Sequence, residues 1–226
     1  GRTFLAEGDD TTSLGQFLAD GRYSSSFIDL HLIPMGASIW SSDPATFDEF
    51  PVKSLLRFLD NHGLLSVGDR PQWKALVGGS VTYVDKIAEH LTGTIRTSTP
   101  VLSVQRFPDR VELESASGTE RFDEVILACH SDQALQMLTD PSPAESEILG
   151  SLRFQPNRAI LHTDTSVLPD AKLAWSAWNY YRRSGGADAG ASVLTYDMTD
   201  LMRLPVTTRY LVSLNDDRIA PDSVLY

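Results

Sequence analysis

The 226-residue sequence contains a single cysteine, Cys129, and no long apolar run. One cysteine cannot form an intrachain disulfide or a thiolate metal cluster, and its rarity fits a reducing compartment. A membrane-spanning helix needs about 20 consecutive apolar residues, and residues 1–10 lack the basic and apolar regions of a signal peptide. We therefore expect a cytoplasmic protein without a transmembrane segment.

Basic residues are also scarce, since 19 Lys and Arg stand against 30 Asp and Glu and give a formal net charge of −11. Such an excess of negative charge repels phosphate backbones and anionic membrane surfaces, so nucleic acid is not an expected partner. The five histidines show no metal-ligand spacing, and no metal site is expected. The 42% of hydrophobic residues is typical of a globular protein that can bury a core.

The first third of the sequence predicts a helical subdomain. Apolar spacing indicates a helix over residues 14–21 and a second helix that begins near residue 24. Pro34 and Gly36 are expected to interrupt that second helix. A third helix is predicted over residues 51–63, with proline near its start, a leucine-rich buried stripe and glycine at its end.

A glycine pair follows at residues 78 and 79. Ala75–Val77 is predicted to be a short strand before it, and residues 80–91 an amphipathic helix after it with an apolar inner face. Glycine lets a backbone approach a phosphate closely, and a helix start offers free N–H groups. Such a pair more often marks only a turn, and the chain contains no complete GxGxxG or GxxxxGK[ST] motif.

The middle of the chain predicts a β-meander followed by a buried strand. Strand-forming runs lie at residues 95–97, 101–106, 111–114 and 119–122. Pro108 and Asp109 mark a hairpin turn. The continuous apolar run Val125–Cys129 is typical of a strand covered on both faces, which belongs in a parallel sheet.

The last third is predicted to be rich in strands, after two short helices over residues 131–138 and 142–149. Expected strands lie at residues 159–163, 174–181 and 192–195, with a polar, glycine-containing loop over 182–191. Strand alternation puts Trp178 and Tyr180 on one face and Tyr181 on the other. Aromatic side chains there suit either a wall of an apolar substrate pocket or ordinary core packing.

In order and spacing, these elements resemble the central segment of flavin-dependent oxidoreductases of the amine oxidase and phytoene desaturase superfamily. The stretches that carry the resemblance are LVGGSVTYVDKIAEHL, IRTSTPVLSVQR, VELES and FDEVILACH. The chain is more closely similar to a bacterial branch of FAD-dependent or NAD/FAD-binding proteins that are often encoded beside cyclopropane fatty acid synthase. That similarity is carried by HLIPMGASIW, RFLDNHGLL, RPQWKALVGGS, LRFQPNRAILHTD and WSAWNY.

The resemblance implies an α/β fold of mixed α+β character, with part of a Rossmann-like FAD-binding domain and a substrate domain of helices on an antiparallel sheet. Residues 1–71 are expected to be the helical part of the substrate domain, 72–138 part of the FAD-binding domain, and 139–226 the β-rich part of the substrate domain. Relatives of this kind also have an N-terminal GxGxxG unit and a C-terminal flavin segment. These 226 residues lack both, so the chain is expected to be a central fragment that is inactive alone.

The resemblance also implies site residues, although it names no catalytic side chain. The expected FAD-binding positions are Val101, Gly78, Gly79 and Ala128. Val101 would hold the adenine end through its backbone, unless it serves only to fill a sheet. The expected substrate-pocket positions are Trp178, Tyr180, His162 and Arg158. For His162 a hydrogen-bonded structural role is the alternative, and Arg158 lies near the place where amine oxidases keep a basic residue beside the flavin.

The function implied is an oxidoreductase in which FAD accepts a hydride from an apolar or amine-bearing small molecule, with a fatty-acyl chain as the preferred substrate class. Two alternatives remain open at this point. One is a flavin-dependent isomerase or desaturase of lipids, and the other is a non-catalytic binding module with the substrate-domain fold. The oligomeric state does not follow from the sequence.

Overall fold

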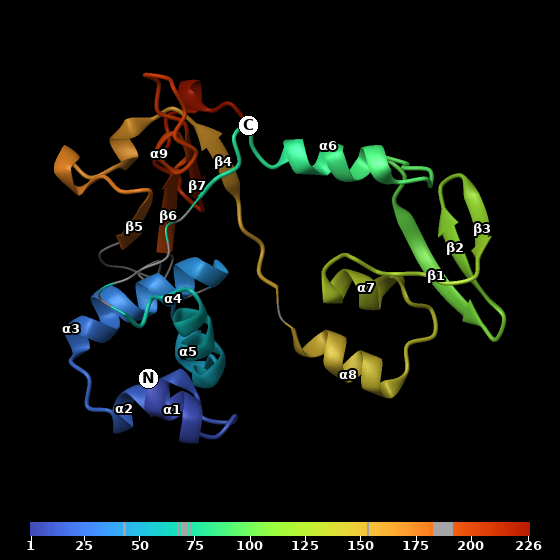
Figure 1. The fold of residues 1–226 in the computed structure, drawn as a ribbon, viewed down its shortest axis with the longest axis horizontal. Coiled ribbons are helices and arrows are strands. Elements are labelled where there is room, and N and C mark those ends of the chain that lie inside the picture. The colour runs from blue at the N-terminus through green and yellow to red at the C-terminus, as the bar shows by residue number, and fades with distance from the viewer. Residues whose placement is uncertain (43, 67, 69–71, 73, 153, 183–191) are drawn as a thin grey trace. The chain divides into compact units, whose positions relative to one another are not determined.

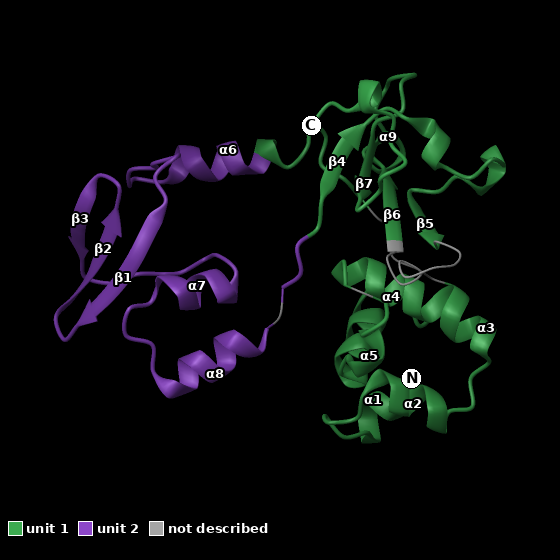
Figure 2. Cartoon of the chain, turned by 180° about the vertical axis from the view of Figure 1, so that it is seen from behind, with its two compact units in different colours: residues 1–82, 157–226 green, residues 83–156 purple. Residues whose placement is uncertain are grey.

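The computed structural model describes every residue except 43, 67, 69–71, 73, 153 and 183–191 (Figure 1). Most of the glycine-containing loop expected over 182–191 therefore lies outside the described residues. The chain divides into two compact units, one of residues 1–82 with 157–226 and one of residues 83–156 (Figure 2). Each unit is described by itself.

The N-terminal part of the first unit is helical. Its elements are α1 (Arg2–Glu7), α2 (Leu14–Asp20), α3 (Ser25–Phe27), the π-helical turn η1 (Ile28–Leu32), α4 (Ile33–Trp40), η2 (Phe47–Glu49) and α5 (Val52–Asn61). Helix α2 begins where the Ser13 side chain accepts a hydrogen bond from the Gln16 N–H. Helix α5 stops just before Gly63, whose φ of 67° favours glycine. The first and third predicted helices are therefore confirmed.

The expected interruption at Pro34 and Gly36 is wrong, because α4 continues through both residues to Trp40. The Ile33 N–H bonds to the carbonyl of Ile28, five residues back, so the preceding turn is wider than an α-helical turn. Pro34 then lies in the first turn of α4, where its missing N–H costs little. Gly36 is needed for another reason, since a Cβ there would lie 2.3 Å from Cε1 of Phe47.

The helices enclose an apolar core within the first unit. Nine buried residues form it: Leu14, Leu18, Leu32, Ala37, Phe47, Val52, Leu55, Leu56 and Leu59. Phe47 is 2% exposed and its ring stacks on that of Phe50 at 5.0 Å between centroids. Trp40 and Phe58 pack around the same core, so aromatic area contributes much of the burial.

The C-terminal part of the first unit is a four-stranded antiparallel sheet of order β4-β7-β6-β5. Its elements are β4 (Ala159–His162), η3 (Thr165–Val167), η4 (Lys172–Ala174), β5 (Trp178–Arg182), β6 (Ser192–Asp197), α9 (Met198–Leu201), β7 (Leu211–Leu214) and η5 (Pro221–Ser223). A second core covers one face of this sheet and consists of Val167, Leu168, Leu211 and Ile219. The helices on an antiparallel sheet that the sequence predicts are thus present in this unit.

Strand β5 begins four residues later than expected, so Trp175 is not part of it. Residues 172–174 form a 3₁₀ turn, and the Trp175 indole N–H donates to the Pro169 carbonyl at 2.7 Å. The Arg209 guanidinium also lies over the Trp175 ring at 5.7 Å. These contacts hold Trp175 against the segment before the strand, which the apolar pattern alone could not indicate.

The second unit contains a three-stranded antiparallel sheet of order β1-β2-β3, the helices α7 and α8, and most of α6. Its elements are β1 (Val101–Phe107), β2 (Arg110–Ser115), β3 (Gly118–Phe122), α7 (Ser131–Met137) and α8 (Pro143–Ser151), and α6 (Val81–His90) begins at its boundary. The predicted meander and its hairpin turn at Pro108 and Asp109 are confirmed. Ser142 and Glu145 form a capping box that begins α8.

Three predicted strands are not formed by the described residues: Ala75–Val77, Ile95–Thr97 and Val125–Cys129. The parallel sheet expected for Val125–Cys129 is likewise absent there, because every strand pair in the two described sheets is antiparallel. Ile126 is 91% exposed and Val77 is 97% exposed. A buried strand is stable only beside partner strands, and no described strand lies beside these three runs.

The apolar face expected on the inside of α6 is exposed instead. Val81, Val84, Ile87 and Leu91 retain between 51% and 59% of their accessible surface. The alternation of apolar and polar residues predicts this face correctly, but burial requires a packing partner, which the described residues do not supply.

Candidate functional site

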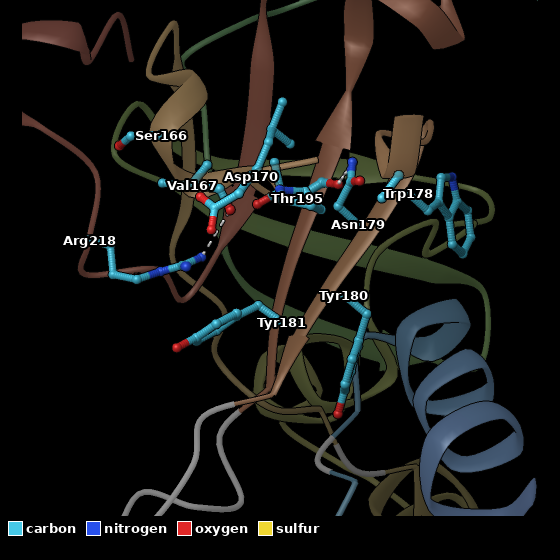
Figure 3. Close-up of a pocket in the computed structure, with 12 residues that line it drawn as sticks. Ser166, Val167, Asp170, Trp178, Asn179, Tyr180, Tyr181, Thr195 and Arg218 are labelled. Atoms are coloured by element: carbon cyan, nitrogen blue, oxygen red, sulfur yellow. Dashed lines mark hydrogen bonds between the residues drawn. The ribbon is translucent and has the colours of Figure 1, made fainter. Parts of the chain in front are cut away.

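A cavity of about 450 Å³ lies in the first unit beside β5, which is one of the two edge strands of the four-stranded sheet (Figure 3). Twelve residues line it: Ser166, Val167, Leu168, Pro169, Asp170, Ala174, Trp178, Asn179, Tyr180, Tyr181, Thr195 and Arg218. Residues 166–170 form one wall, and β5 with its neighbour β6 forms another. This volume is in the range of pockets that bind small molecules.

The aromatic residues of β5 alternate as the sequence predicts. Trp178 lies opposite Tyr196 of β6 and meets its ring edge to face at 5.4 Å. Tyr181 lies on the other face, where the Arg218 guanidinium is 3.9 Å from its ring centroid. Figure 3 shows Tyr181 on the Arg218 side and Trp178 with Tyr180 away from it. The strand therefore presents aromatic surface on both of its faces.

Arg218 is held in place by a buried carboxylate. Its Nε and Nη2 donate to the two carboxylate oxygens of Asp216 at 2.9 and 2.7 Å, and Asp216 is 1% exposed. Nη2 also donates to the carbonyl of Val167, which joins the arginine to the opposite cavity wall. Bidentate pairing fixes the plane of the guanidinium and cancels most of its charge.

His162 does not line the cavity, because it is 0% exposed inside the sheet. Its Nδ1 accepts a hydrogen bond from the Asp164 N–H at 3.2 Å, and its Nε2 lies 2.9 Å from Ser213 Oγ. Burial lowers the pKa of His162, while the charges of Asp164 and Asp216 act in the opposite direction. The imidazole is therefore neutral at neutral pH.

The lowered pKa of His162 predicts a loss of stability in mild acid. Below the ordinary histidine pKa of about 6.5, the unfolded chain binds a proton that the folded chain does not, so the free energy of unfolding falls as pH falls. Urea unfolding at about pH 7.5 and about pH 5.5 measures this slope. His162→Gln should reduce the slope, whereas the matched change His31→Gln at an exposed position should leave it unchanged. Equal slopes in both variants would contradict the assignment.

Arg158 also lies outside the cavity lining. Its guanidinium pairs with Asp217, its Nη2 donates to the Asp216 carbonyl at 3.3 Å, and its side chain is 58% exposed. Of the four expected pocket residues, Trp178 and Tyr180 line the cavity, while His162 and Arg158 do not. Thr195 and Arg218 line it without having been predicted. The signal for Thr195 was a polar residue between the apolar Leu194 and the aromatic Tyr196.

The two glycines expected to contact the cofactor lie in a turn, and a Cβ at Gly78 would lie 2.9 Å from Cγ2 of Thr82. Gly78 and Gly79 have φ values of 85° and 80°, a region that residues with a Cβ rarely adopt. Apart from the two chain neighbours of Gly79, no atom of the described residues lies within 4 Å of the position where Gly79 would carry a Cβ, so a ligand could approach this backbone. A phosphate group would fit such a turn.

The other two expected cofactor positions belong to the second unit. Val101 is the first residue of β1, is partly buried and pairs with Ser115 of β2. Ala128 is exposed in the unpaired segment that follows β3. Neither position has a side chain that could bond a ligand, so each could contribute only its backbone and its surface.

Within the described part of the chain, no three His, Cys, Asp or Glu side chains gather in a way that could hold a metal ion. The helices of these residues are also too short or too polar for any of them to cross a membrane.

The family model described as flavin containing amine oxidoreductase matches residues 6–218. Two solved structures are similar in fold. One is assigned as a protoporphyrinogen oxidase from Exiguobacterium sp. 255-15, with 17% identity and a TM-score of 0.53 over 94% of this chain. The other is a CLA-producing fatty acid isomerase from P. acnes, with 14% identity and a TM-score of 0.51 over 93% of this chain.

At these identities the two likenesses establish the fold alone. The chain spans about half the length of these proteins, 48% of the first and 53% of the second. No curated protein matches the chain.

Proposed function

Because the chain belongs to the family of flavin-containing amine oxidoreductases, we propose that the whole protein is an FAD-dependent oxidoreductase acting on an apolar small molecule. The family match over residues 6–218 carries this proposal, and it confirms the expected cofactor class. When bound, FAD would supply the hydride-accepting chemistry, and the protein would supply orientation and shelter from water.

Within this proposal the chain's own residues have two tasks. The positive-φ turn at Gly78 and Gly79 would let the backbone approach a phosphate of the cofactor, and Val101 with Ala128 would add backbone contacts. We retain the proposed assignment of residues 72–138 to the FAD-binding domain and of residues 1–71 and 139–226 to the substrate domain. The fold likeness to two enzymes of about twice this length supports reading the chain as one part of such a protein.

The cavity beside β5 is the proposed substrate site. Trp178, Tyr180 and Tyr181 of β5 all line it, with Tyr181 on the face that Arg218 covers, and the segment 166–170 adds the apolar residues Val167 and Leu168. Apolar walls favour the apolar part of a ligand by removing it from water. A fatty-acyl chain is our preferred substrate, supported by the fold likeness to a fatty acid isomerase.

The test uses the intact protein, purified and examined for bound FAD by its absorbance and by release on denaturation. Under anaerobic conditions, a fatty-acyl substrate should bleach the flavin absorbance, because a hydride reduces the isoalloxazine ring. Aliphatic and aromatic amines form the comparison series. An intact protein without FAD would refute the proposal and favour a non-catalytic binding module.

A second candidate is an isomerase that shifts a double bond without net oxidation, and the fold likeness to a fatty acid isomerase favours it. Product analysis separates the two candidates. An isomerase would return its flavin to the oxidised state after each turnover and would consume no oxygen, whereas an oxidase would consume one oxygen molecule for each product formed.

A further inference from the structure

Three polar side chains on three adjacent strands form a hydrogen-bonded row that ends at the cavity. His162 of β4 lies 2.9 Å from Ser213 Oγ of β7, and Ser213 Oγ lies 2.7 Å from Thr195 Oγ1 of β6. The three residues are 0%, 0% and 2% exposed. Only Thr195 lines the cavity, beside Asn179 (Figure 3). The row therefore connects a buried histidine to the cavity wall.

The direction of each hydrogen bond in the row follows from counting protons. Nδ1 of His162 accepts from the Asp164 N–H, so it carries no proton and a neutral ring must be protonated at Nε2. His162 Nε2 then donates to Ser213 Oγ. Two hydroxyl protons then remain for the one hydrogen bond between Ser213 Oγ and Thr195 Oγ1. The Ser213 proton has no other acceptor among the described residues, whereas Thr195 reaches the cavity, so a ligand acceptor there would make Ser213 the donor to Thr195.

The hydroxyl proton of Thr195 is left over by this count. Thr195 Oγ1 accepts from Ser213, and no described residue accepts the proton that Thr195 itself carries. A buried donor without an acceptor is costly, so such a donor in a cavity wall is suited to a ligand oxygen. We propose that Thr195 is a substrate-binding donor and that the cavity binds molecules with an uncharged carbonyl oxygen on an apolar body, such as acyl esters or amides.

The charges around the cavity favour an uncharged carbonyl over a carboxylate. The positive charge of Arg218 is matched by Asp216 through two hydrogen bonds. Asp170 also lines the cavity and has no ion-pair partner among the described residues, so the remaining charge there is negative. The negative charge of a carboxylate headgroup would be repelled by Asp170, and no unpaired cation among the described lining residues would offset this repulsion. A neutral carbonyl carries no net charge and avoids the repulsion.

Binding of decanamide, decanoate and decylamine to the intact protein tests the inference, which rests on the proposed substrate role of the cavity. Decanamide has the neutral carbonyl, decanoate has a charged one, and decylamine has none. We expect decanamide to bind more tightly than decanoate, and Thr195→Val to weaken decanamide binding about five- to tenfold, the usual size of one lost hydrogen bond. Thr195→Ser keeps the hydroxyl and should restore most of the affinity, while decylamine binding should not respond to either change.

A second measurement concerns the row itself. Nitrogen NMR of His162 in the unmodified protein should show the neutral ring protonated at Nε2, and Ser213→Ala should weaken decanamide binding without affecting decylamine. His162 and Ser213 are positioning residues in this scheme, because they act on the ligand only through Thr195.

The inference is overturned if Thr195→Val binds decanamide as tightly as the unmodified protein, if decanamide does not bind, if decanoate binds more tightly than decanamide, or if His162 is protonated at Nδ1. If Thr195→Val fails to fold, protonation of His162 at Nδ1 still overturns the inference, and so does unchanged decanamide binding by Ser213→Ala. Failure of the proposed function has a different signature, since a protein that lacks FAD but binds decanamide through Thr195 would refute only the flavin chemistry.

Discussion

Phe47→Ala is expected to lower the free energy of unfolding of the first unit by about 3 to 5 kcal/mol, the range for removing a buried aromatic ring. Phe47 is 2% exposed at the centre of the helical core, and Gly36 packs directly against its ring. Because α4 and α5 both pack on this core, neither could move in to fill the space without breaking other contacts.

Hydrogen exchange of the α5 amides, followed with increasing urea, measures this loss within the first unit. Phe27→Ala is the matched control, since the same ring is removed from a position that is 38% exposed. We expect the control to cost about 1 kcal/mol or less. Equal losses in the two variants would show that Phe47 does not occupy the core as described.

Gly79→Ala should weaken FAD binding by the intact protein about five- to thirtyfold. A Cβ at a left-handed position costs about 1 to 2 kcal/mol, and relaxing the backbone to avoid that cost would move the turn away from its ligand. The φ of Gly79 is 80° and no atom lies within 4 Å of the added methyl group, so the effect would come from conformation rather than from a clash within the chain.

Gly93→Ala is the matched control, because Gly93 also has open space at its Cβ position but is not among the glycines with positive φ. Titration of the FAD-free protein with FAD, followed by quenching of flavin fluorescence, gives the two affinities. An unchanged affinity in Gly79→Ala would remove this turn from the proposed cofactor site.

Much of the local structure could be predicted from the sequence because it depends on neighbouring residues. The apolar spacing after residue 14, the glycine stop at Gly63 and the turn at Pro108 all act over a few positions, and α2, α5 and the β1–β2 hairpin form accordingly. The prediction that Pro34 interrupts a helix also considered only neighbouring residues, and it was wrong. The effect of Pro34 depends on the wider turn before it, which no residue pattern indicated.

Longer-range features were predicted less well. The apolar face of α6 and the run Val125–Cys129 have the patterns of buried elements, yet the face is exposed and no residue of the run is buried. A periodic pattern states which residues would be buried together, but the packing partner is a separate piece of chain. The resemblance to flavin-dependent oxidoreductases, by contrast, required only the order of short motifs, and the family match confirms it.

The candidate site likewise has features that follow from local strand geometry and features that depend on contacts between distant strands. The alternation of Trp178 and Tyr180 against Tyr181 follows from strand geometry, so the sequence by itself determined which aromatic faces β5 presents. Only the tertiary structure decided that His162, Ser213 and Thr195 meet, because 51 residues separate the first pair and 18 the second. Their contact depends on strand order and register across β4, β7 and β6, where a shift of one residue would turn each side chain to the other face.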